Sequence, residues 1–424
     1  MSGIVITLWL IGLAVAIMFQ PVLGPLVYYM VDWMHPEKQM YGGLNLRWGM
    51  VLAVVSLISY LYIGSRRVWP GNALTVILII FSIWYFSSAL VNNVNSQEFS
   101  LAVDFIKIIL MCVITASVIN TRLRIHALIW IVVIAIGMAS FRTGLITVLS
   151  AGSKNVLGPP FLGETNEYAR FVIYTWPLML FLSRHSAHAY VRYGFMALAG
   201  ISVFALIGTN SRGAMVAFAA MCFILWLYSS RKITYMLIAG ALASIFYFAA
   251  SEKRLESFTN RQSTITRADE DNSFLGRTRA WEWGWGYVQK NPVLGGGPGV
   301  YERIHGRASH NSYFEVLGES GFVGFALWSV IALLTLNTIL RIRRLSKGIP
   351  DLLWAYDLSF FIMITMAGYF VGGITKNHGM NEYYYMLIAI LMGTEIAVRN
   401  YLISQAREED FTKPHYHMQQ SSTG

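Results

Sequence analysis

Residues 72–91 read NALTVILIIFSIWYFSSALV, twenty residues without a charged side chain. A helix rises about 1.5 Å per residue, so this run can cross the roughly 30 Å hydrocarbon core of a bilayer. Pro21, Gly24 and Pro25 leave open whether the first such run in the chain is one helix or two half-helices. The sequence predicts an all-α polytopic membrane protein with about twelve transmembrane helices, near 4–33, 46–63, 72–91, 101–119, 125–149, 167–183, 190–208, 213–229, 233–250, 322–340, 353–374 and 383–400.

The composition excludes a soluble protein. Charged residues make up 13% of the 424, about half the share that soluble domains carry, and hydrophobic residues make up 55%. The same numbers exclude an intrinsically disordered chain. Cys112 and Cys222 both lie in apolar runs, which excludes a disulfide framework and a cysteine metal site.

Basic residues gather on one side of the predicted bundle. The opposite short loops hold only isolated charges such as Lys38, Lys154 and Lys376. This separation follows the positive-inside rule and predicts that both termini are cytoplasmic. The net charge of +10 therefore indicates orientation in a membrane rather than nucleic-acid binding. The basic set comprises Arg66, Arg67, Arg122, Arg124, Arg184, Arg192, Arg231, Lys232, Arg341, Arg343, Arg344, Lys347, Arg399, Arg407 and Lys413.

One segment, 251–321, is long enough to divide the chain. We expect spans one to nine in 1–250, an extracytoplasmic loop in 251–321, spans ten to twelve in 322–402, and a disordered cytoplasmic tail in 403–424. Long translocated segments escape the charge rule, so the nine Lys and Arg residues of this loop do not contradict the topology. Their presence outside the cytoplasm indicates an anionic partner.

Arginines mark the extracytoplasmic face. Arg212 lies in a turn of almost no length, so its guanidinium is expected at the membrane boundary, where it either reaches lipid phosphate or binds a phosphate or diphosphate bidentately. Arg277 admits the same interpretation, with an ion pair to Glu282 as the alternative. Arg142, about 18 residues into span five, is deep enough to approach this face.

His310 directly precedes a predicted helix start. Ser312 and Glu315 have the Ser-x-x-Glu spacing of a capping box. The positive end of a helix disfavours an imidazolium, keeps a neutral base available near pH 7 and attracts anions. The alternative is a histidine that only hydrogen-bonds at a helix entry. Convergence with Arg212 and Arg277 favours the catalytic interpretation.

Other motifs of the long loop are weaker. The stretch 295–299 lacks the Lys-Ser/Thr of a P-loop and is interpreted as a turn. The acidic run 269–271 fits a solvated surface better than a metal site, and the histidines share no metal-ligand spacing. Trp281, Trp283 and Trp285 are explained equally by sugar stacking and by an interfacial aromatic belt. No metal and no cofactor is predicted.

These motifs resemble those of one family. Gly276-Arg277 with Trp281, followed by NPVLGGGPG at 291–299, is similar to the signature of the O-antigen ligase and polymerase superfamily. The same holds for HNSYF at 310–314 with ESGFVG at 319–324, NSRG at 210–213 and NEYA at 166–169. PVLGP at 21–25, with WM at 33–34 and Pro36, resembles the exosortase-associated O-glycosylation ligase branch. The resemblance covers most of the chain.

The resemblance implies a GT-C-like fold and a reaction. Such proteins transfer a glycan from undecaprenyl diphosphate to a hydroxyl of a protein, lipid or glycan, on the periplasmic face of the bacterial inner membrane, without a metal or nucleotide. Carried over by motif, His310 would be the general base or would orient the acceptor. Arg212 and Arg277 would bind the diphosphate. Asn166, Arg142 and Glu319 are further candidates for substrate binding.

Two alternatives stay open. A polysaccharide polymerase differs from a ligase only in its acceptor, which is another lipid-linked glycan. A transporter or flippase would concentrate ionisable groups and broken helices near the bilayer midplane. Here the broken first span favours transport, whereas the nearly charge-free span centres and the polar groups at one face, Asp104 and Lys107 among them, favour an enzyme. Tyr384 and its neighbours near Lys376 are further candidates for the same cavity, although no motif marks them.

Overall fold

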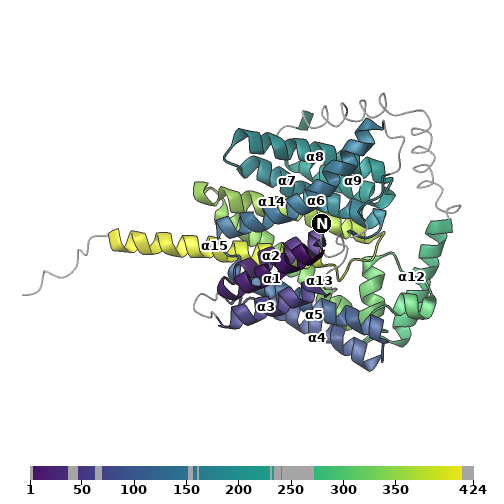
Figure 1. Ribbon diagram of the computed structural model, residues 1–424. Coiled ribbons are helices and arrows are strands. Elements are labelled where there is room, and N and C mark those ends of the chain that lie inside the picture. The colour runs from purple at the N-terminus through teal and green to yellow at the C-terminus, as the bar shows by residue number, and fades with distance from the viewer. Residues whose placement is uncertain are drawn as a thin grey trace, which may run out of the picture.

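The computed structural model describes residues 3–36, 46–62, 69–150, 156–159, 162–229, 232–233, 240 and 272–412, with side chains from 275 to 408 in the last range (Figure 1). Every regular element in these ranges is helical. In chain order they are α1 (Gly3–Phe19), α2 (Leu23–Met34), α3 (Trp48–Tyr62), α4 (Ala73–Val91), α5 (Ser96–Val118), α6 (Arg122–Leu149), α7 (Thr165–His185), α8 (Ala189–Thr209), α9 (Arg212–Tyr228), α12 (Asn272–Lys290), η5 (Tyr301–His305), α13 (Ser312–Ser346), η6 (Pro350–Leu352), α14 (Leu353–Gly373) and α15 (Glu382–Thr412).

The helices confirm a multi-pass membrane protein. Seven segments in the described part of the chain are long and apolar enough to span a bilayer: Ala73–Val91, Ser96–Val118, Arg122–Leu149, Ala189–Thr209, Ser312–Ser346, Pro350–Gly373 and Glu382–Glu408. Shorter apolar helices cover Gly3–Phe19, Trp48–Tyr62 and Arg212–Tyr228. The predicted span 233–250 lies almost wholly outside the described residues. The count of twelve spans stays a prediction.

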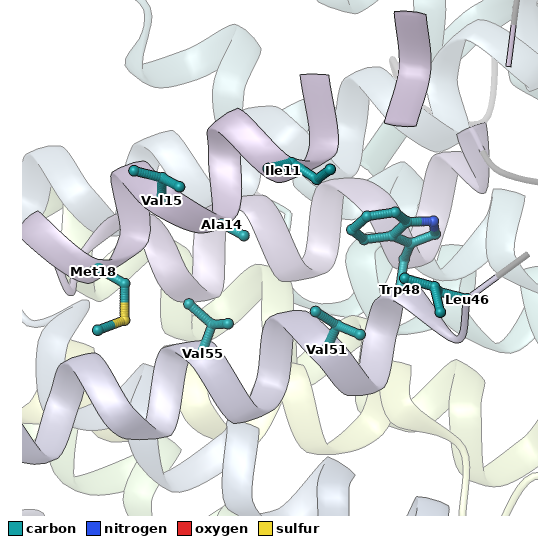
Figure 2. Close-up of a pocket in the computed structure, with 8 residues that line it drawn as sticks. All are labelled: Ile11, Ala14, Val15, Met18, Leu46, Trp48, Val51 and Val55. Atoms are coloured by element: carbon teal, nitrogen blue, oxygen red, sulfur yellow. The ribbon is translucent and has the colours of Figure 1, made fainter. Parts of the chain in front are cut away.

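The first apolar run is two helices. α1 ends at Phe19 and α2 begins at Leu23, with Pro21 in the turn between them. Both helices pack on α3: the Ser59 hydroxyl donates to the carbonyl of Ile17 at 2.6 Å. Beside α1 and α3 lies an apolar groove of about 300 Å³, drawn in Figure 2 with Trp48 at one end. Its lining is otherwise aliphatic or Met, as expected of a surface that faces lipid.

Several residues of the predicted basic set form ion pairs at helix ends in the described part of the chain. The Arg341 guanidinium lies 3.0 Å from Glu395, which Arg399 also contacts at 2.6 Å. Arg184 lies 3.0 Å from Asp357. The first two pairs join the end of α13 to the middle of α15, and the third joins the last turn of α7 to the start of α14. The cytoplasmic location of these helix ends stays a prediction.

The two predicted loop boundaries differ from the helices. α13 begins at Ser312, so the last ten residues of the predicted loop 251–321 are helical. The predicted end of that loop coincides with Gly321, whose φ of 69° interrupts the helix. α15 continues to Thr412 and projects beyond the bundle (Figure 1), into a region predicted to be a disordered tail. Residues 251–271 and 413–424 lie outside the described ranges.

Candidate functional site

His310 is presented from a short segment that is fixed on both sides. Its φ of 47° places the backbone in the left-handed region. Before it, the Ser309 hydroxyl donates to Oδ1 of Asn377 at 2.7 Å, and after it the Asn311 N–H donates to the same oxygen at 2.9 Å. Trp281 donates its indole N–H to the Ser309 carbonyl at 2.8 Å. Because both neighbours are anchored, the position of His310 is set by residues from α12 and from the loop between α14 and α15.

The helix that follows His310 is capped by Asn311. Its side-chain oxygen accepts from the N–H groups of Tyr313 and Phe314 at 2.9 and 3.2 Å. The predicted helix start directly after His310 is confirmed, but the predicted capping box of Ser312 and Glu315 is wrong. An asparagine is as good an N-cap as a serine, and it stands one residue earlier.

Ser312 and Glu315 bind the 374–381 loop instead. The Ser312 hydroxyl donates to the Lys376 carbonyl at 2.8 Å and accepts from the His378 N–H at 3.0 Å. Glu315 accepts from the Gly379 N–H at 2.8 Å. The start of α13 and the α14–α15 loop therefore form one hydrogen-bonded unit, which brings Lys376 to the His310 side of the protein.

The surroundings of His310 favour its neutral form. Burial lowers the pKa of the imidazole, and the positive charges of Arg277 and Lys376 lower that pKa further. The carboxylate of Glu164 acts in the opposite direction. It is engaged by Lys376 at 3.1 Å, and this hydrogen bond lowers the pKa of Glu164. The imidazole of His310 is therefore uncharged near pH 7.

A buried arginine joins this cationic group. Arg170 of α7 is 3% exposed and lies close enough to Arg277 for their positive charges to repel each other. Its guanidinium donates to the hydroxyl of Thr375 at 2.7 Å and to the carbonyl of Asn166 at 3.3 Å, and its Nε has no hydrogen-bond partner among the described residues. A buried cation is costly unless it meets an anion or several acceptors. Together with Arg277 and Lys376 it makes this end of the bundle suited to an anion.

The turn that carries Arg212 packs on the same elements. α8 ends at Thr209, Asn210 adopts a φ of 55°, and Arg212 begins α9, so the predicted tight turn is confirmed. Gly213 lies so close to Thr375 and Arg170 that a Cβ on Gly213 would stand 2.3 Å from the Thr375 hydroxyl and 3.0 Å from the Arg170 guanidinium. Arg212 itself is half-buried.

Asn166 and Arg142 are more peripheral. Asn166 is exposed in the first turn of α7, and its carbonyl is the group that contacts Arg170. Arg142 is exposed on α6 and forms no ion pair with any described residue. The neighbouring Thr143 hydroxyl lies 2.5 Å from the Tyr168 hydroxyl, which places this end of α6 beside the start of α7.

Glu319 makes its contacts within the protein. It is 6% exposed, accepts from the Tyr85 hydroxyl at 2.6 Å, and accepts from the Gly299 N–H at 2.9 Å. The carbonyl of Glu319 accepts from the Ser88 hydroxyl at 2.8 Å and from the Gly297 N–H at 3.0 Å. Glu319 therefore joins α4, the glycine-rich stretch 295–299 and α13.

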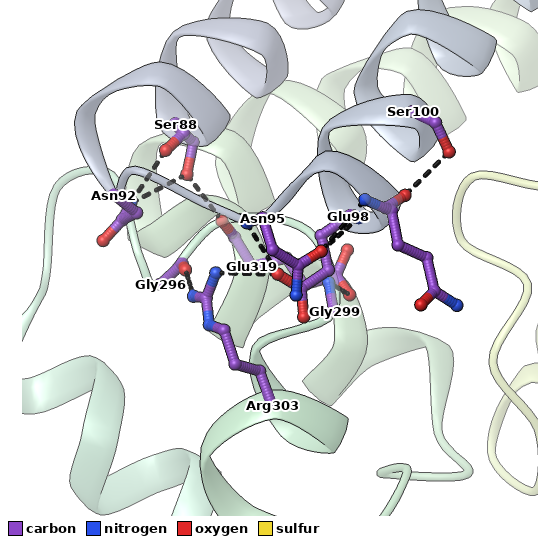
Figure 3. A network of polar contacts seen from close by, with 10 residues as sticks. Ser88, Asn92, Asn95, Glu98, Ser100, Gly296, Gly299, Arg303 and Glu319 are labelled. Carbon is purple, nitrogen blue, oxygen red and sulfur yellow. Dashed lines mark hydrogen bonds and ion pairs between the residues drawn. The ribbon is translucent and has the colours of Figure 1, made fainter.

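Arg303 completes that network (Figure 3). Its guanidinium lies 3.2 Å from Glu98, the residue that closes the capping box of α5, and it also donates to the Gly296 carbonyl. The backbone of the glycine-rich stretch is thus tied to α4 and α13, and the Arg303 side chain joins it to α5, in agreement with its interpretation as a turn.

The tryptophans divide between support and surface. Trp281 stacks on Phe314 with ring centres 5.8 Å apart, and Trp283 stacks on His305 at 5.0 Å. Trp285 is 48% exposed. Tyr384 is fully buried and stacks on Tyr369 at 4.8 Å, which makes it a core residue.

Sequence reasoning missed Arg170, Asn377 and His378. Arg170 stands near the start of α7, and the 374–381 loop carries no motif, so only packing shows the place of these residues. His378 is buried with its Nε2 3.2 Å from the Tyr174 hydroxyl, and burial lowers its pKa far below the ordinary value. In the described part of the chain no three or more His, Cys, Asp or Glu side chains are arranged to hold a metal ion. The acidic run 269–271 lies outside it.

Comparison with known proteins identifies two regions. Residues 197–329 match the model of a family described as O-antigen ligase. Residues 1–187 match that of a family of unknown function. No curated protein matches the chain. The first match contains Arg212, Arg277 and His310 and supports a ligase- or polymerase-type membrane function, whereas the exosortase-associated branch stays a prediction.

Proposed function

We propose that this protein is a glycosyltransferase of the O-antigen ligase type, which moves a glycan from undecaprenyl diphosphate to an acceptor hydroxyl at the extracytoplasmic surface of the bacterial inner membrane. The observation that carries the proposal is the environment of His310. A neutral base stands beside the cations of Arg277 and Lys376, and it lies in the segment that matches the O-antigen ligase family. A general base and an anion site are the two things that this transfer requires.

The proposed reaction uses each group once. The acceptor oxygen attacks the anomeric carbon of the donor sugar and forms a new glycosidic bond. The bond between that carbon and the diphosphate oxygen breaks, and its electron pair leaves with undecaprenyl diphosphate. The acceptor proton passes to the imidazole of His310, which can accept it because the pKa shift keeps the ring uncharged.

Cations contribute where negative charge develops. As the diphosphate leaves, the oxygen that linked it to the sugar gains negative charge. Fixed guanidinium groups stabilise this charge better than mobile water does. We assign this role to Arg277 and Arg212, with Lys376 completing the positive field and Arg170 buried behind it. Asn166 and Arg142 are proposed to contact the substrate from their exposed positions at the edge of the site. Glu319 is proposed to position the glycine-rich turn 295–299.

The acceptor is the finer part of the proposal. The stretch 21–36 resembles the exosortase-associated O-glycosylation branch, which supports a hydroxyl on a protein as the acceptor. A polymerase would instead join two lipid-linked glycans with the same residues. Incubation of membranes with donor alone tests this choice, because only a polymerase then lengthens the lipid-linked glycan.

Replacement of His310 by Ala tests the base. Membranes that contain the H310A variant should transfer no detectable glycan from a lipid-linked donor, because activity should fall by about 10²- to 10⁴-fold when a general base is lost. His305→Ala is the matched control, since His305 ends η5, five residues before His310, and stacks on Trp283. Transfer by H310A at the rate of H305A, with equal protein in the membrane, would refute the assigned role.

A further inference from the structure

A second, partly polar cavity of about 390 Å³ lies beside the group of cations formed by Arg170, Arg277 and Lys376, which is called the cationic site below. It is bordered by the end of α2, by α5, by the start of α7 and by the start of α15. Its lining includes Asp32, Trp33, Glu167, Phe171 and Glu382. Its volume falls within the roughly 300–1,000 Å³ of ordinary ligand pockets.

The cavity shares two elements with the cationic site. Glu167 stands one helical turn after Glu164, which holds Lys376. Glu382 follows His378 by four residues at the end of the same loop. A molecule whose charged group lies at Arg277 and Lys376 would therefore have this cavity as its neighbour.

Two buried polar atoms of the lining lack partners. Glu382 is 8% exposed, and its Oε1 has no hydrogen-bond partner in the described ranges. Trp33 is 4% exposed, and its indole N–H also has no partner there. Buried polar groups are nearly always hydrogen-bonded in folded proteins, so each such exception calls for an explanation. Here one acceptor and one donor belong to residues that line the same cavity.

The lining is rich in carboxyl groups. Asp32, Glu167 and Glu382 contribute three of them, with Lys107 near Glu382 and with Lys376 and Arg170 near Glu167. His35 also lines the cavity. The described carboxyl groups do not form a metal-binding group. Carboxyl groups that are balanced by nearby cations suit an uncharged ligand that is rich in hydroxyl groups.

Aromatic rings supply the remaining feature. Trp33 and Phe171 meet edge to face with ring centres 4.9 Å apart, and the ring of Tyr383 lies 5.5 Å from that of Trp33 and 6.1 Å from that of Phe171. Rings that combine an apolar face with a polar handle suit the face of a sugar ring, which is apolar on its C–H side and polar at its rim. Carboxylates then accept hydrogen bonds from sugar hydroxyls, and the indole N–H donates to one.

We infer that this cavity is a subsite for an uncharged sugar ring of a glycan substrate, with Glu382 accepting from one hydroxyl and Trp33 donating to another. The inference rests on the proposed function, because it assigns the space next to the diphosphate site to a sugar. That sugar belongs either to the donor glycan or to a glycan acceptor, and the test below separates the two.

Binding of two lipids tests the subsite on the full-length protein in detergent. One probe is undecaprenyl diphosphate, and the other is the same lipid with its glycan attached. The wild-type protein should bind the glycan-bearing lipid about tenfold more tightly, which is the effect of about one hydrogen bond to a charged group. Glu382→Gln and Trp33→Phe should remove this preference and leave the affinity for undecaprenyl diphosphate unchanged.

Matched controls and a second arm make each outcome decisive. Glu408→Gln and Trp69→Phe change the same residue types at exposed positions and should behave as wild type. If the wild type shows no preference between the lipids, an acceptor subsite is still supported when E382Q and W33F raise the KM for a glycan acceptor about tenfold. No effect in either arm would overturn the subsite. Failure to bind undecaprenyl diphosphate at all, or binding that Arg277→Ala does not weaken, would instead contradict the proposed function.

Discussion

Asn377 holds the residues on both sides of His310 through a single oxygen, and this makes it a positioning residue. Asn377→Ala removes the acceptor for Ser309 and Asn311. We expect kcat to fall about 10- to 100-fold, because a displacement of about 1 Å from a reactive geometry costs that much. The affinity for undecaprenyl diphosphate should stay unchanged. Turnover and lipid binding of the purified variant measure the two effects.

Asn377→Asp is the rescue variant for that prediction. An aspartate keeps the accepting oxygen, so it should restore most of the turnover that the alanine loses. Its negative charge near His310 should also move the acid limb of the pH profile to higher pH. Equal loss in both variants would show that Asn377 acts through its amide nitrogen or through packing rather than through the shared oxygen.

The pH dependence tests the charges around His310. The base is active when neutral, and its pKa lies below the ordinary value, so kcat/KM should rise with pH through that lowered pKa and stay level at neutral pH. Lys376→Gln removes a charge that lowers the pKa and should move the rise to higher pH. Glu164→Gln removes a charge that raises it and should move the rise to lower pH. Lys290→Gln, exposed at the end of α12, serves as the control.

At the residue scale, motifs led to the proposed reactive groups but not to the residues that hold them in place. His310, Arg277 and the Arg212 turn could be chosen because charged residues at a membrane face need a reason. Arg170 resembles any arginine near a helix end until its burial is seen. Asn377 could not be chosen, because its role depends on contact between segments 66 residues apart, which no local pattern encodes.

At the element scale, Gly321 divides α13 into the part that serves the site and the part that spans the membrane. Its φ is 69°, and a Cβ would stand 2.3 Å from the Val293 carbonyl oxygen. Gly348 has a φ of 79° but open space around it. Gly348→Ala should therefore cost only about 1 kcal/mol of stability, whereas Gly321→Ala should cost at least about 3 kcal/mol and also lower activity.

Thermal unfolding in detergent measures the stability of the Gly321→Ala and Gly348→Ala variants, and glycan transfer measures their activity. Both glycines have a positive φ, and Gly321 also has a ψ of −173°, a conformation that is essentially confined to glycine. The larger loss at Gly321 therefore reports this conformation together with the contact between the α12–η5 turn and α13. Equal melting temperatures would show that the turn yields to a methyl group at no cost, and would contradict the expected cost of the close approach between Gly321 and Val293.

The existence of the helices was largely predictable from the sequence, because the length of each apolar run indicates a helix. The positions of the helix ends were less predictable. The break at Pro21 needed the structure to decide between one helix and two. The capping box at Ser312 was wrong because two adjacent residues are both good caps and tertiary contacts take up the second. The Ser312 hydroxyl could serve the 374–381 loop only because Asn311 already caps the helix.

At the scale of the whole molecule, the charges define two ends. Lys290 and Lys347 are exposed at positions predicted to lie on opposite sides of the membrane. In intact spheroplasts a membrane-impermeant thiol reagent should label Lys290→Cys, and it should label Lys347→Cys only after permeabilisation. Cys112 is buried and Cys222 is partly buried, so the cysteine-bearing parent should give a low background. The reverse pattern would invert the topology and remove His310 from the proposed compartment.

The most direct test of the central claim is the release of undecaprenyl diphosphate by the purified protein. With a lipid-linked glycan and an acceptor, the account predicts one molecule of undecaprenyl diphosphate for each glycan transferred, and none from the H310A variant. A transporter would move the donor across a vesicle membrane with its glycosyl bond intact. Glycan movement without release of undecaprenyl diphosphate, or equal release by H310A, would contradict the account.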